Sequence, residues 1–393
     1  MSKTQQSNTY KKSLPSRVVF LGWGLLLMGL VVTIAGYLIE PRHAAFTNVT
    51  GFLFLTSIAV GALFLVALEY LSGAVWSVPM RRVNEFLASL LSIAALLAVP
   101  LFFHLGDVFR WTNDAIVSQD AVLKVKVPYL NVPFLIERFA AVFFIWILFY
   151  VLFTRNSRKQ DVDKNQKRTK WNITLSAIFM PIFAFGLTIL SIDWAMSLEP
   201  RWYSTIFGVY YFSGIALAAV ALATYVVVKL NETGYLPQLR RDHYYSLGTL
   251  MFVFVNFWAY IAFSQFMLIW YANLPEETIW FIARWHHGWE FISILLIVVQ
   301  FGIPYFVLLS QEAKMDPRRL KFMAIWILCA HALDLYWLVM PTYQVSPAFG
   351  WTEVGFILLL VGIVIVVFHR NMKKYNLVPI GDPKLQRGLD FHL

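Results

Sequence analysis

Ten long apolar stretches, each long enough to cross a lipid bilayer as one helix, constrain this 393-residue chain more than any other feature. A transmembrane helix needs about 20 mostly apolar residues, because the hydrocarbon core of a bilayer is about 30 Å thick. We therefore predict an all-α polytopic membrane protein with about ten transmembrane helices. The candidate spans lie at 17–39, 51–72, 85–106, 131–153, 172–193, 204–229, 246–271, 285–309, 320–340 and 350–369.

The overall composition agrees with a chain that is dissolved in lipid. Hydrophobic residues make up 59% of the chain and charged residues only 14%, whereas a soluble domain carries about 25% charged residues. The first apolar stretch is longer than a signal-peptide core of about 7–15 residues, so we expect it to be retained as a span. A water-soluble protein of this length could not bury so much apolar surface.

The single cysteine limits the chemistry of the chain. Cys329 lies inside an apolar stretch, so the sequence excludes an internal disulfide, a cysteine-ligated iron–sulfur cluster and a CxxCH haem site. No P-loop, Rossmann glycine pattern or HExxH motif is present. We therefore expect no metal and no redox cofactor bound by this chain, and no nucleotide-driven transport.

The Lys and Arg residues lie mainly on one side of the predicted spans. Of the 32, 25 fall in the segments on the side that holds both chain termini, and six fall on the opposite side. Short loops rich in Lys and Arg stay in the cytoplasm, so both termini are predicted to be cytoplasmic. The net charge of +10 is thus explained by membrane orientation and does not indicate nucleic-acid binding.

The polar segments predict how the chain is divided. The longest outer connection, 107–130, is expected to form a short amphipathic helix on the membrane surface with Trp111 as its anchor. The cytoplasmic linker is expected to be solvated, and the tail to be extended, lying along a partner. The predicted divisions are a cytoplasmic N-terminal segment 1–16, spans one to four at 17–153, the linker 154–171, spans five to ten at 172–370, and the cytoplasmic tail 371–393.

Ionisable residues inside the spans are the first candidates for a functional site, because charges are costly in a bilayer. Most are predicted near the outer ends of their spans, and Glu69 alone lies toward the cytoplasm. His287 with Glu290, and His331 with Asp334, are spaced i,i+3, so each pair can share a helix face. A histidine beside a carboxyl group can exchange a proton near neutral pH. The predicted proton-relay residues are Glu69, His104, Glu137, Asp193, His287, Glu290, His331 and Asp334.

A second set of polar and aromatic residues at the outer ends is predicted to line a quinone-binding cavity or its rim. Amide side chains can hydrogen-bond a quinone carbonyl or an internal water. The members of this set are Arg138, Arg201, Gln265, Trp270, Asn273 and Arg284.

Structural alternatives stay open for both sets. His286 and His287 would then face lipid headgroups, and Asp334 and Glu290 would pair with Arg138 or Arg284 to fix helix packing. The polar side chains at the end of the seventh span would serve hydrogen bonds between helices. In a further alternative, His104 and His331 would be haem ligands.

Three stretches point to a known family. They are IDWAMSLEPRWYSTIFGVYYF (192–212), FWAYIAFSQFMLIWYANLPEET (257–278) and HALDLYWLVMPTY (331–343). Together with the ten-span layout they resemble the NrfD/PsrC-like integral membrane subunits, and among these the ActF subunits of bacterial alternative complex III. The resemblance covers the chain from about residue 17 to 370.

The resemblance implies a fold and a function. Spans 2–5 and 6–9 would form two four-helix bundles flanked by spans 1 and 10. The chain would be a non-autonomous subunit of a quinol:cytochrome c (or cupredoxin) oxidoreductase in the bacterial inner membrane, in respiratory or photosynthetic electron transfer. It would bind quinol or menaquinol, conduct protons, serve as a scaffold, or combine these roles. Haems and iron–sulfur clusters would lie in partners: a multihaem cytochrome, an iron–sulfur subunit and an ActC-like sister subunit.

Two rival functions remain at this stage. Ten spans with buried charges also suit a secondary transporter, in which Glu69 and the outer carboxylates would be alternating gates. The other rival is a purely structural membrane anchor whose polar pairs serve only packing. Co-purification with multihaem cytochromes would separate the first rival from a subunit of an electron-transfer complex.

Overall fold

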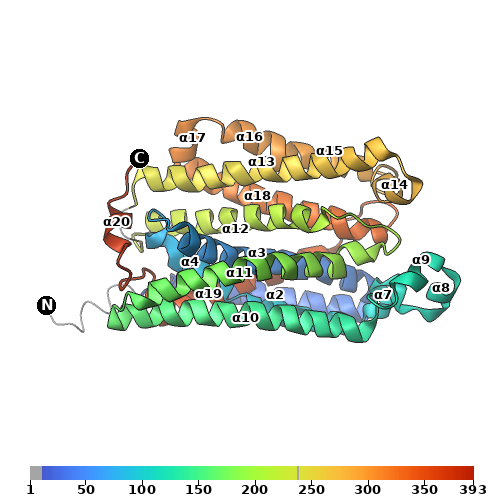
Figure 1. The fold of residues 1–393 in the computed structure, drawn as a ribbon, viewed down its shortest axis with the longest axis horizontal. Helices are drawn as coiled ribbons and strands as arrows, with labels where there is room; N and C mark the ends of the chain where they lie inside the picture. Colours follow the sequence, from blue (N-terminus) through green and yellow to red (C-terminus); the bar gives the residue numbers. More distant parts are fainter. Residues whose placement is uncertain (1–10, 237–238) are drawn as a thin grey trace.

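The computed structural model describes residues 11–236 and 239–393 and confirms the all-α prediction: ten helices in these ranges are long and apolar enough to cross a membrane. They run side by side along the long axis of the molecule (Figure 1). The spans are α2 (Ser16–Ile39), α3 (Pro41–Ser72), α4 to α6 (Arg81–Ala88, Leu91–Leu97, Val99–Phe102), α10 (Val132–Asp163), α11 (Lys167–Trp194), α12 (Phe207–Glu232), α13 (Arg241–Ala272), α15 to α16 (Trp289–Leu296, a π-helix η4 at Ile297–Gly302, and Ile303–Val307), α18 (Pro317–Val339) and α19 (Trp351–Lys374).

The short helices lie at the ends of the spans, in the connections between them and in the C-terminal tail. The longest connection carries α7 (Leu105–Val108), η2 (Arg110–Thr112), α8 (Asp114–Gln119) and α9 (Ala121–Lys126). The others are η1 (Val78–Met80), η3 (Met196–Leu198), α14 (Pro275–Ile282), α17 (Gln311–Met315), η5 (Met340–Thr342) and α20 (Leu385–Leu389).

The spans pack as two four-helix bundles, as the resemblance implied. The first bundle holds α3, α4 to α6, α10 and α11, and the second holds α12, α13, α15 to α16 and α18. The helices α3 and α12 pack against each other at the centre and are the most buried of the ten. Gly61 permits this contact, because a Cβ atom added there would lie 2.6 Å from the Cβ of Ala219.

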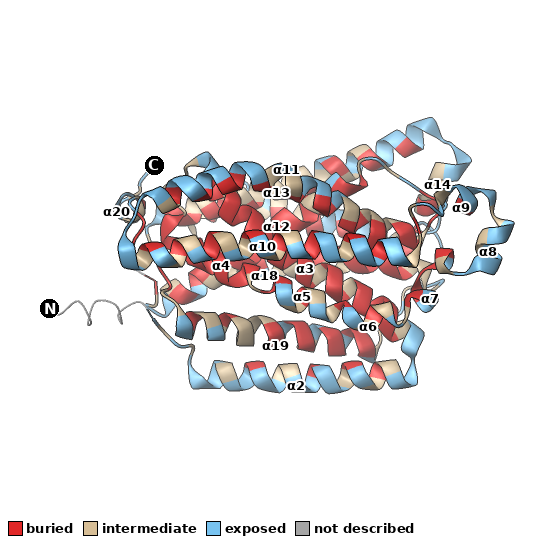
Figure 2. Ribbon diagram, turned by 60° about the horizontal axis from the view of Figure 1, so that its bottom comes forward, coloured by how far each residue is buried: buried red, intermediate tan, exposed pale blue. Residues whose placement is uncertain are grey.

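Helices α2 and α19 form a pair outside the two bundles (Figure 2). Small residues bring their backbones together: a Cβ atom at Gly29 would lie 2.2 Å from the backbone nitrogen of Leu359, and one at Gly362 would lie 2.4 Å from that of Leu26. Close approach through glycine is a common means of helix association in lipid, where water does not drive apolar surfaces together.

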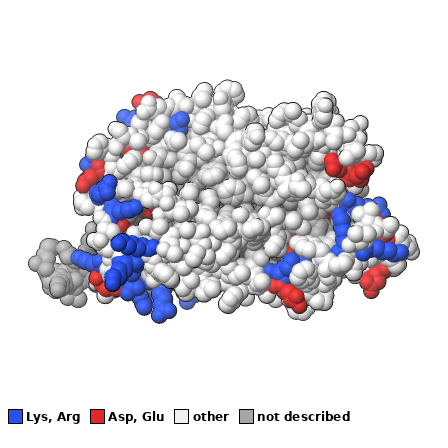
Figure 3. Space-filling model, viewed as in Figure 1, with Lys and Arg blue, Asp and Glu red and all other residues white. Residues whose placement is uncertain are grey.

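The two ends of the molecule differ in the segments they carry. The tail end, at the left of Figure 1, holds the start of α2, the connection between α10 and α11, and α20; the loop end, at the right, holds α7 to α9 and α14. Figure 3 shows Lys, Arg, Asp and Glu gathered at both ends, with an uncharged band between them on this face. Such a band is what the hydrocarbon core of a bilayer requires.

The connections differ from the sequence predictions in two ways. The segment 154–171 is mostly helical, because α10 runs on to Asp163 and α11 begins at Lys167, although most of its residues are exposed, as in a solvated linker. Trp111 is not a membrane anchor, since it is buried and packs on Phe109. The apolar ring of Trp111 thus packs inside the connection and does not lie on the membrane surface.

The predicted extended tail instead folds back onto the tail end of its own chain. Leu377 and Val378 are fully buried there. The imidazole of His243 in α13 bonds the backbone oxygen of Gly388 at 2.8 Å, and the ammonium group of Lys384 donates to the backbone oxygen of Gly73 after α3, at 2.9 Å. The tail therefore contacts both bundles.

Candidate functional site

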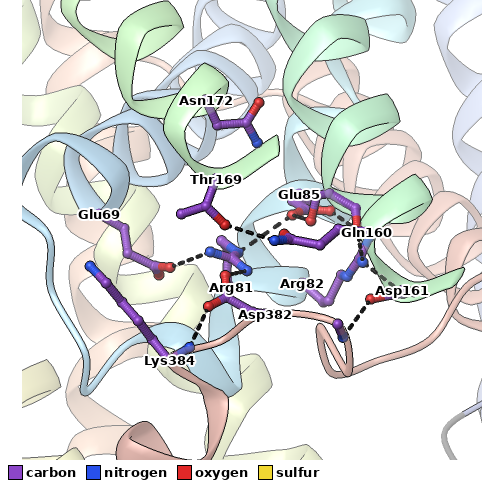
Figure 4. A network of polar contacts seen from close by, with 12 residues as sticks. Glu69, Arg81, Arg82, Glu85, Gln160, Asp161, Thr169, Asn172, Asp382 and Lys384 are labelled. Carbon is purple, nitrogen blue, oxygen red and sulfur yellow. Dashed lines mark hydrogen bonds and ion pairs between the residues drawn. The ribbon is translucent and has the colours of Figure 1, made fainter. Parts of the chain in front are cut away.

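A buried ionic network at the tail end is centred on Arg81 (Figure 4). Its guanidinium group lies 3.1 Å from the carboxylate of Glu69, 2.5 Å from that of Asp382 and 3.7 Å from that of Glu85. The three carboxylates come from α3, from α4 and from the C-terminal tail. Arg81 thus ties together segments that lie far apart in the sequence.

The network continues through the neighbouring Arg82. This side chain pairs with Glu85 at 2.9 Å and with Asp161 of α10 at 2.8 Å. The hydroxyl of Ser157 donates to Glu85 at 2.6 Å. The two guanidinium groups are fully or almost fully buried, so the network is part of the protein interior.

The sequence prediction that buried ionisable groups gather at the outer ends of the spans is therefore incomplete, and Glu69 is not alone. The prediction failed because Arg81 and Arg82 were counted as loop charges that set orientation, and because Asp161 and Asp382 fell in segments expected to be solvated. The sequence signal that could have found the network is the RRVNE run directly before the third span.

A second polar site lies within the second bundle, around Asp334 of α18. Its carboxylate accepts hydrogen bonds from the hydroxyl of Tyr210 at 2.5 Å and from the indole N–H of Trp258 at 3.2 Å. Asp334 is 2% exposed and forms no ion pair with any described residue. A buried carboxyl group without a counter-ion is expensive in its charged form, so it is suited to accepting and releasing a proton.

His331, one helical turn away from Asp334, is also buried. Neither of its ring nitrogens has a hydrogen-bond partner among the described residues. Both side chains face Gly214 of α12: a Cβ atom there would lie 3.0 Å from the His331 ring and 3.8 Å from the Asp334 carboxylate. The prediction that the two share one helix face is confirmed, although they do not bond each other.

Other buried polar groups within the helices also lack partners in the described ranges. They are the side-chain oxygen of Gln265, both amide atoms of Gln300 in the π-helix, and the hydroxyls of Thr56 and Thr224. Buried polar atoms in native proteins are almost always bonded, either to protein or to ordered water. These atoms therefore indicate sites for internal water. Sequence reasoning found Gln265 and missed Gln300.

One alternative predicted that Asp334 and Glu290 pair with Arg138 or Arg284. Neither arginine does so in the structure. Arg138 makes two bonds to Asp193, at 2.8 and 2.9 Å. Arg284 instead donates to three backbone oxygens, including those of Trp337 at 3.1 Å and Leu338 at 2.8 Å, which lie near the end of α18. Both arginines hold helix ends in place.

The predicted pairs of Glu290 with the neighbouring histidines are absent from the structure. His287 (φ 59°) and Gly288 (φ 95°) turn the chain, so α15 begins only at Trp289 and the histidines are not on the helix. Glu290 instead accepts from the backbone N–H of Gly288 at 2.8 Å, and both His286 and His287 are exposed.

The remaining predicted site residues lie at or near the surface of the loop end. Glu137, Trp270 and Asn273 are exposed, and Asn273 ends α13 in the left-handed conformation. Arg201 is exposed and pairs with Asp120 at 2.6 Å; its guanidinium holds the pKa of that carboxyl group below its ordinary value.

The structure does not support haem ligation by the two candidate histidines. His104 pairs with Asp107 at 2.9 Å and packs on Tyr37 of α2, whereas His331 packs on Phe54 and Gly214. No group of three or more metal-binding side chains occurs among the residues that the structure describes.

Sequence reasoning also missed a cluster between α3 and α19 at the loop end. His43 lies 2.7 Å from Glu353 and 3.0 Å from Glu40. Thr47 donates to Glu353 at 3.1 Å, and the backbone N–H of Gly350 donates to the same carboxylate at 2.9 Å. His43 was passed over because it precedes the apolar stretch that defined the second span.

These features define a multi-pass integral membrane protein with ionisable groups buried toward both ends of its helices. Neither the protein-family models nor the curated proteins include a match to this chain.

Proposed function

We propose that this chain is a membrane subunit of a quinol-oxidising electron-transfer complex, and that it conducts protons and serves as a scaffold without redox cofactors of its own. The observation that carries the proposal is the pair Asp334 and His331, buried inside the second bundle with no counter-ion in the part of the chain that the structure describes. An ionisable group that serves only packing would be expected to have a permanent counter-ion, as Arg138 and Asp193 have in each other.

Unpartnered polar atoms extend from this pair in both directions. Gln265 of α13 lies closer to the loop end, and Thr224 of α12 lies closer to the tail end, where Glu69 and its network begin. Ordered waters bonded to these atoms would supply a proton route between Glu69 and Asp334. We place the tail end in the cytoplasm of a bacterial inner membrane, because its segments carry most of the Lys and Arg.

The resemblance supports the quinol assignment. The likeness of the 192–212, 257–278 and 331–343 stretches to the ActF subunits includes Asp193, Gln265 and Asp334 themselves. Quinol oxidation releases protons along with electrons, so a complex of this kind needs a membrane subunit that can carry protons. The partners would be a multihaem cytochrome, an iron–sulfur subunit and an ActC-like subunit, and the haems and clusters would belong to them.

The proposal is tested with Asp334→Asn in the assembled complex. The amide keeps the size of the side chain but cannot exchange protons at neutral pH. Loss of a positioned acid–base group lowers rates by about 10²–10⁴-fold, so we expect quinol oxidation or proton release to fall by at least about tenfold. Gly214→Val, which pushes on His331, should act in the same direction.

The matched control is Glu137→Gln, because this carboxylate is exposed. It should leave both activities unchanged. Wild-type quinol oxidation and proton release in Asp334→Asn would refute the relay and leave the chain as a structural anchor. That second function is favoured by the fully paired Arg138 and Asp193, and by the network around Arg81.

A further inference from the structure

A cavity of about 280 Å³ lies at the tail end, between the two bundles. It is bounded by α3, α4, α12, α13 and the turn that joins α3 to α4. The cavity is a little smaller than the pockets of about 300–1,000 Å³ that hold drug-sized ligands. It therefore has room for a compact head group but not for a whole lipid.

The polarity of the cavity changes along its length. Its polar lining, which consists of Glu69, Ser72, Ser77 and Asn84, lies at the tail end. Further into the membrane the walls are apolar and come from both bundles, with Leu65 of α3 and Val220 of α12 among them. A molecule with a polar head and an apolar chain would be oriented by this gradient, its head toward Glu69.

The polar groups favour a head group that donates hydrogen bonds. The side-chain oxygen of Asn84 is buried and has no bond to any described residue. The carboxylate of Glu69 sits at the edge of the ionic network (Figure 4), in which four carboxylates lie with the two guanidinium groups of Arg81 and Arg82 and the ammonium group of Lys384. An anionic head group would be repelled there, and a neutral hydrogen-bond donor would be accepted.

The open side of the cavity permits entry from the bilayer. Its lining is partly exposed at Leu68 of α3 and at Leu250 of α13, both on membrane-spanning helices, and the indole of Trp76 forms part of the wall. A flat aromatic head group can pack against an indole ring. A phospholipid head group with its glycerol and two chains would fit poorly in a space of this size.

From these features we infer that the cavity binds the aromatic diol head group of a hydroquinone at the tail end, with its hydroxyl groups donating to Glu69 and Asn84. This deepens the proposed function, on which the choice of a quinol rests, by adding a binding site at the end opposite to the predicted outer cavity residues. The inference concerns binding, and it assigns no electron transfer to this site.

Binding is measured with the full chain in nanodiscs of phosphatidylcholine, using a tritium-labelled hydroquinone with a decyl chain under anaerobic conditions. Leu250→Trp fills the cavity and should weaken binding by at least tenfold. Asn84→Leu removes one acceptor at nearly constant volume and should weaken binding by about five- to tenfold. The loss of this acceptor breaks no hydrogen bond seen in the described chain, so the variant should fold normally.

The control is Val253→Trp, three residues after Leu250 on α13. Val253 is 49% exposed and does not line the cavity, so hydroquinone binding should be unchanged. Equal binding by all the variants would overturn the inference. Displacement of the hydroquinone by phosphatidylethanolamine in the nanodisc, with the same variants losing bound lipid, would assign the cavity to a lipid and would overturn it as well.

The failure of this inference is distinct from the failure of the proposed function. Hydroquinone binding is measured on the chain alone, and the Asp334 test is measured on the assembled complex. Hydroquinone binding that does not depend on the cavity residues, together with a strong effect of Asp334→Asn, would reject only the tail-end site. Binding at this cavity together with a neutral Asp334→Asn would reject only the proton relay.

Discussion

The buried ion pair between Arg138 and Asp193 permits a quantitative prediction. The guanidinium group is 7% exposed and the carboxylate 2%, and they share two hydrogen bonds of 2.8 and 2.9 Å. Removing one partner of a buried pair leaves the other charge uncompensated, which costs about 3–5 kcal/mol. We therefore expect Arg138→Met and Asp193→Leu, made singly, each to lower the free energy of unfolding by about that amount.

The double variant should behave differently from the sum of the two. Replacing both members of a buried pair by apolar residues of similar size is often nearly neutral. Arg138 also donates to the backbone oxygen of Tyr129 at 2.9 Å and lies over its ring, and the loss of this hydrogen bond costs about 1 kcal/mol. The double variant should then fall about 1–2 kcal/mol below the wild type, for a coupling of several kcal/mol.

The assay is reversible unfolding in mixed micelles of increasing dodecyl sulfate content, followed by circular dichroism. Losses that simply add in the double variant would refute the reasoning, because they would mean that neither charge depends on the other. Single losses below about 1 kcal/mol would refute it too, since they would show that water reaches the pair as it does at a protein surface.

Three further predictions follow from packing and charge. Gly362→Leu should destabilise the α2–α19 pair by about 1–3 kcal/mol through overpacking, as measured by the same unfolding assay. Gly24→Leu, which has open space around it, should have little effect. Equal effects of the two substitutions would contradict the role of close helix approach. Arg81→Met should lower the free energy of unfolding by at least about 3 kcal/mol. Asp382→Asn should lower it by less, because Arg81 then keeps Glu69 and Glu85 as partners. The reverse order in the unfolding assay would rule out Arg81 as the centre of the network. Arg201 lowers the pKa of Asp120, so the ion pair should persist at neutral pH and be lost as the pH falls through that lowered value. Proteolysis of the α8–α9 connection should therefore become faster in acid, and Asp120→Asn should abolish this pH dependence. A pH dependence that survives the substitution has another cause.

The spans and their grouping could be predicted because the bilayer imposes a simple rule on the sequence. Stretches such as 51–72 and 204–229 must be helical, since a backbone in lipid has to satisfy its own hydrogen bonds. The end of a helix is not fixed by the same rule. Helix α10 continues for ten residues past its predicted end at 153, and the sequence gives no sign of this because Ser157 and Asp161 are as polar as loop residues.

The candidate site was predictable only where its residues lie close in sequence. His331 and Asp334 are one turn apart on a single helix, so helical spacing was enough to place them together. The partners of Asp334 are 124 and 76 residues away, at Tyr210 and Trp258. The contact of Asp382 with Arg81 likewise depends on how the tail folds back, which no local pattern in the sequence indicates.

The folding-back of the tail sets an order of events during synthesis. Arg81 and Asp382 are separated by 301 residues, and at about 5–20 residues per second the ribosome needs roughly 15–60 s to make that length. Throughout this interval Arg81 can pair with Glu69 and Glu85 but not with Asp382. The ion cluster at this end is therefore a late step of maturation, and the helices are already inserted when it closes.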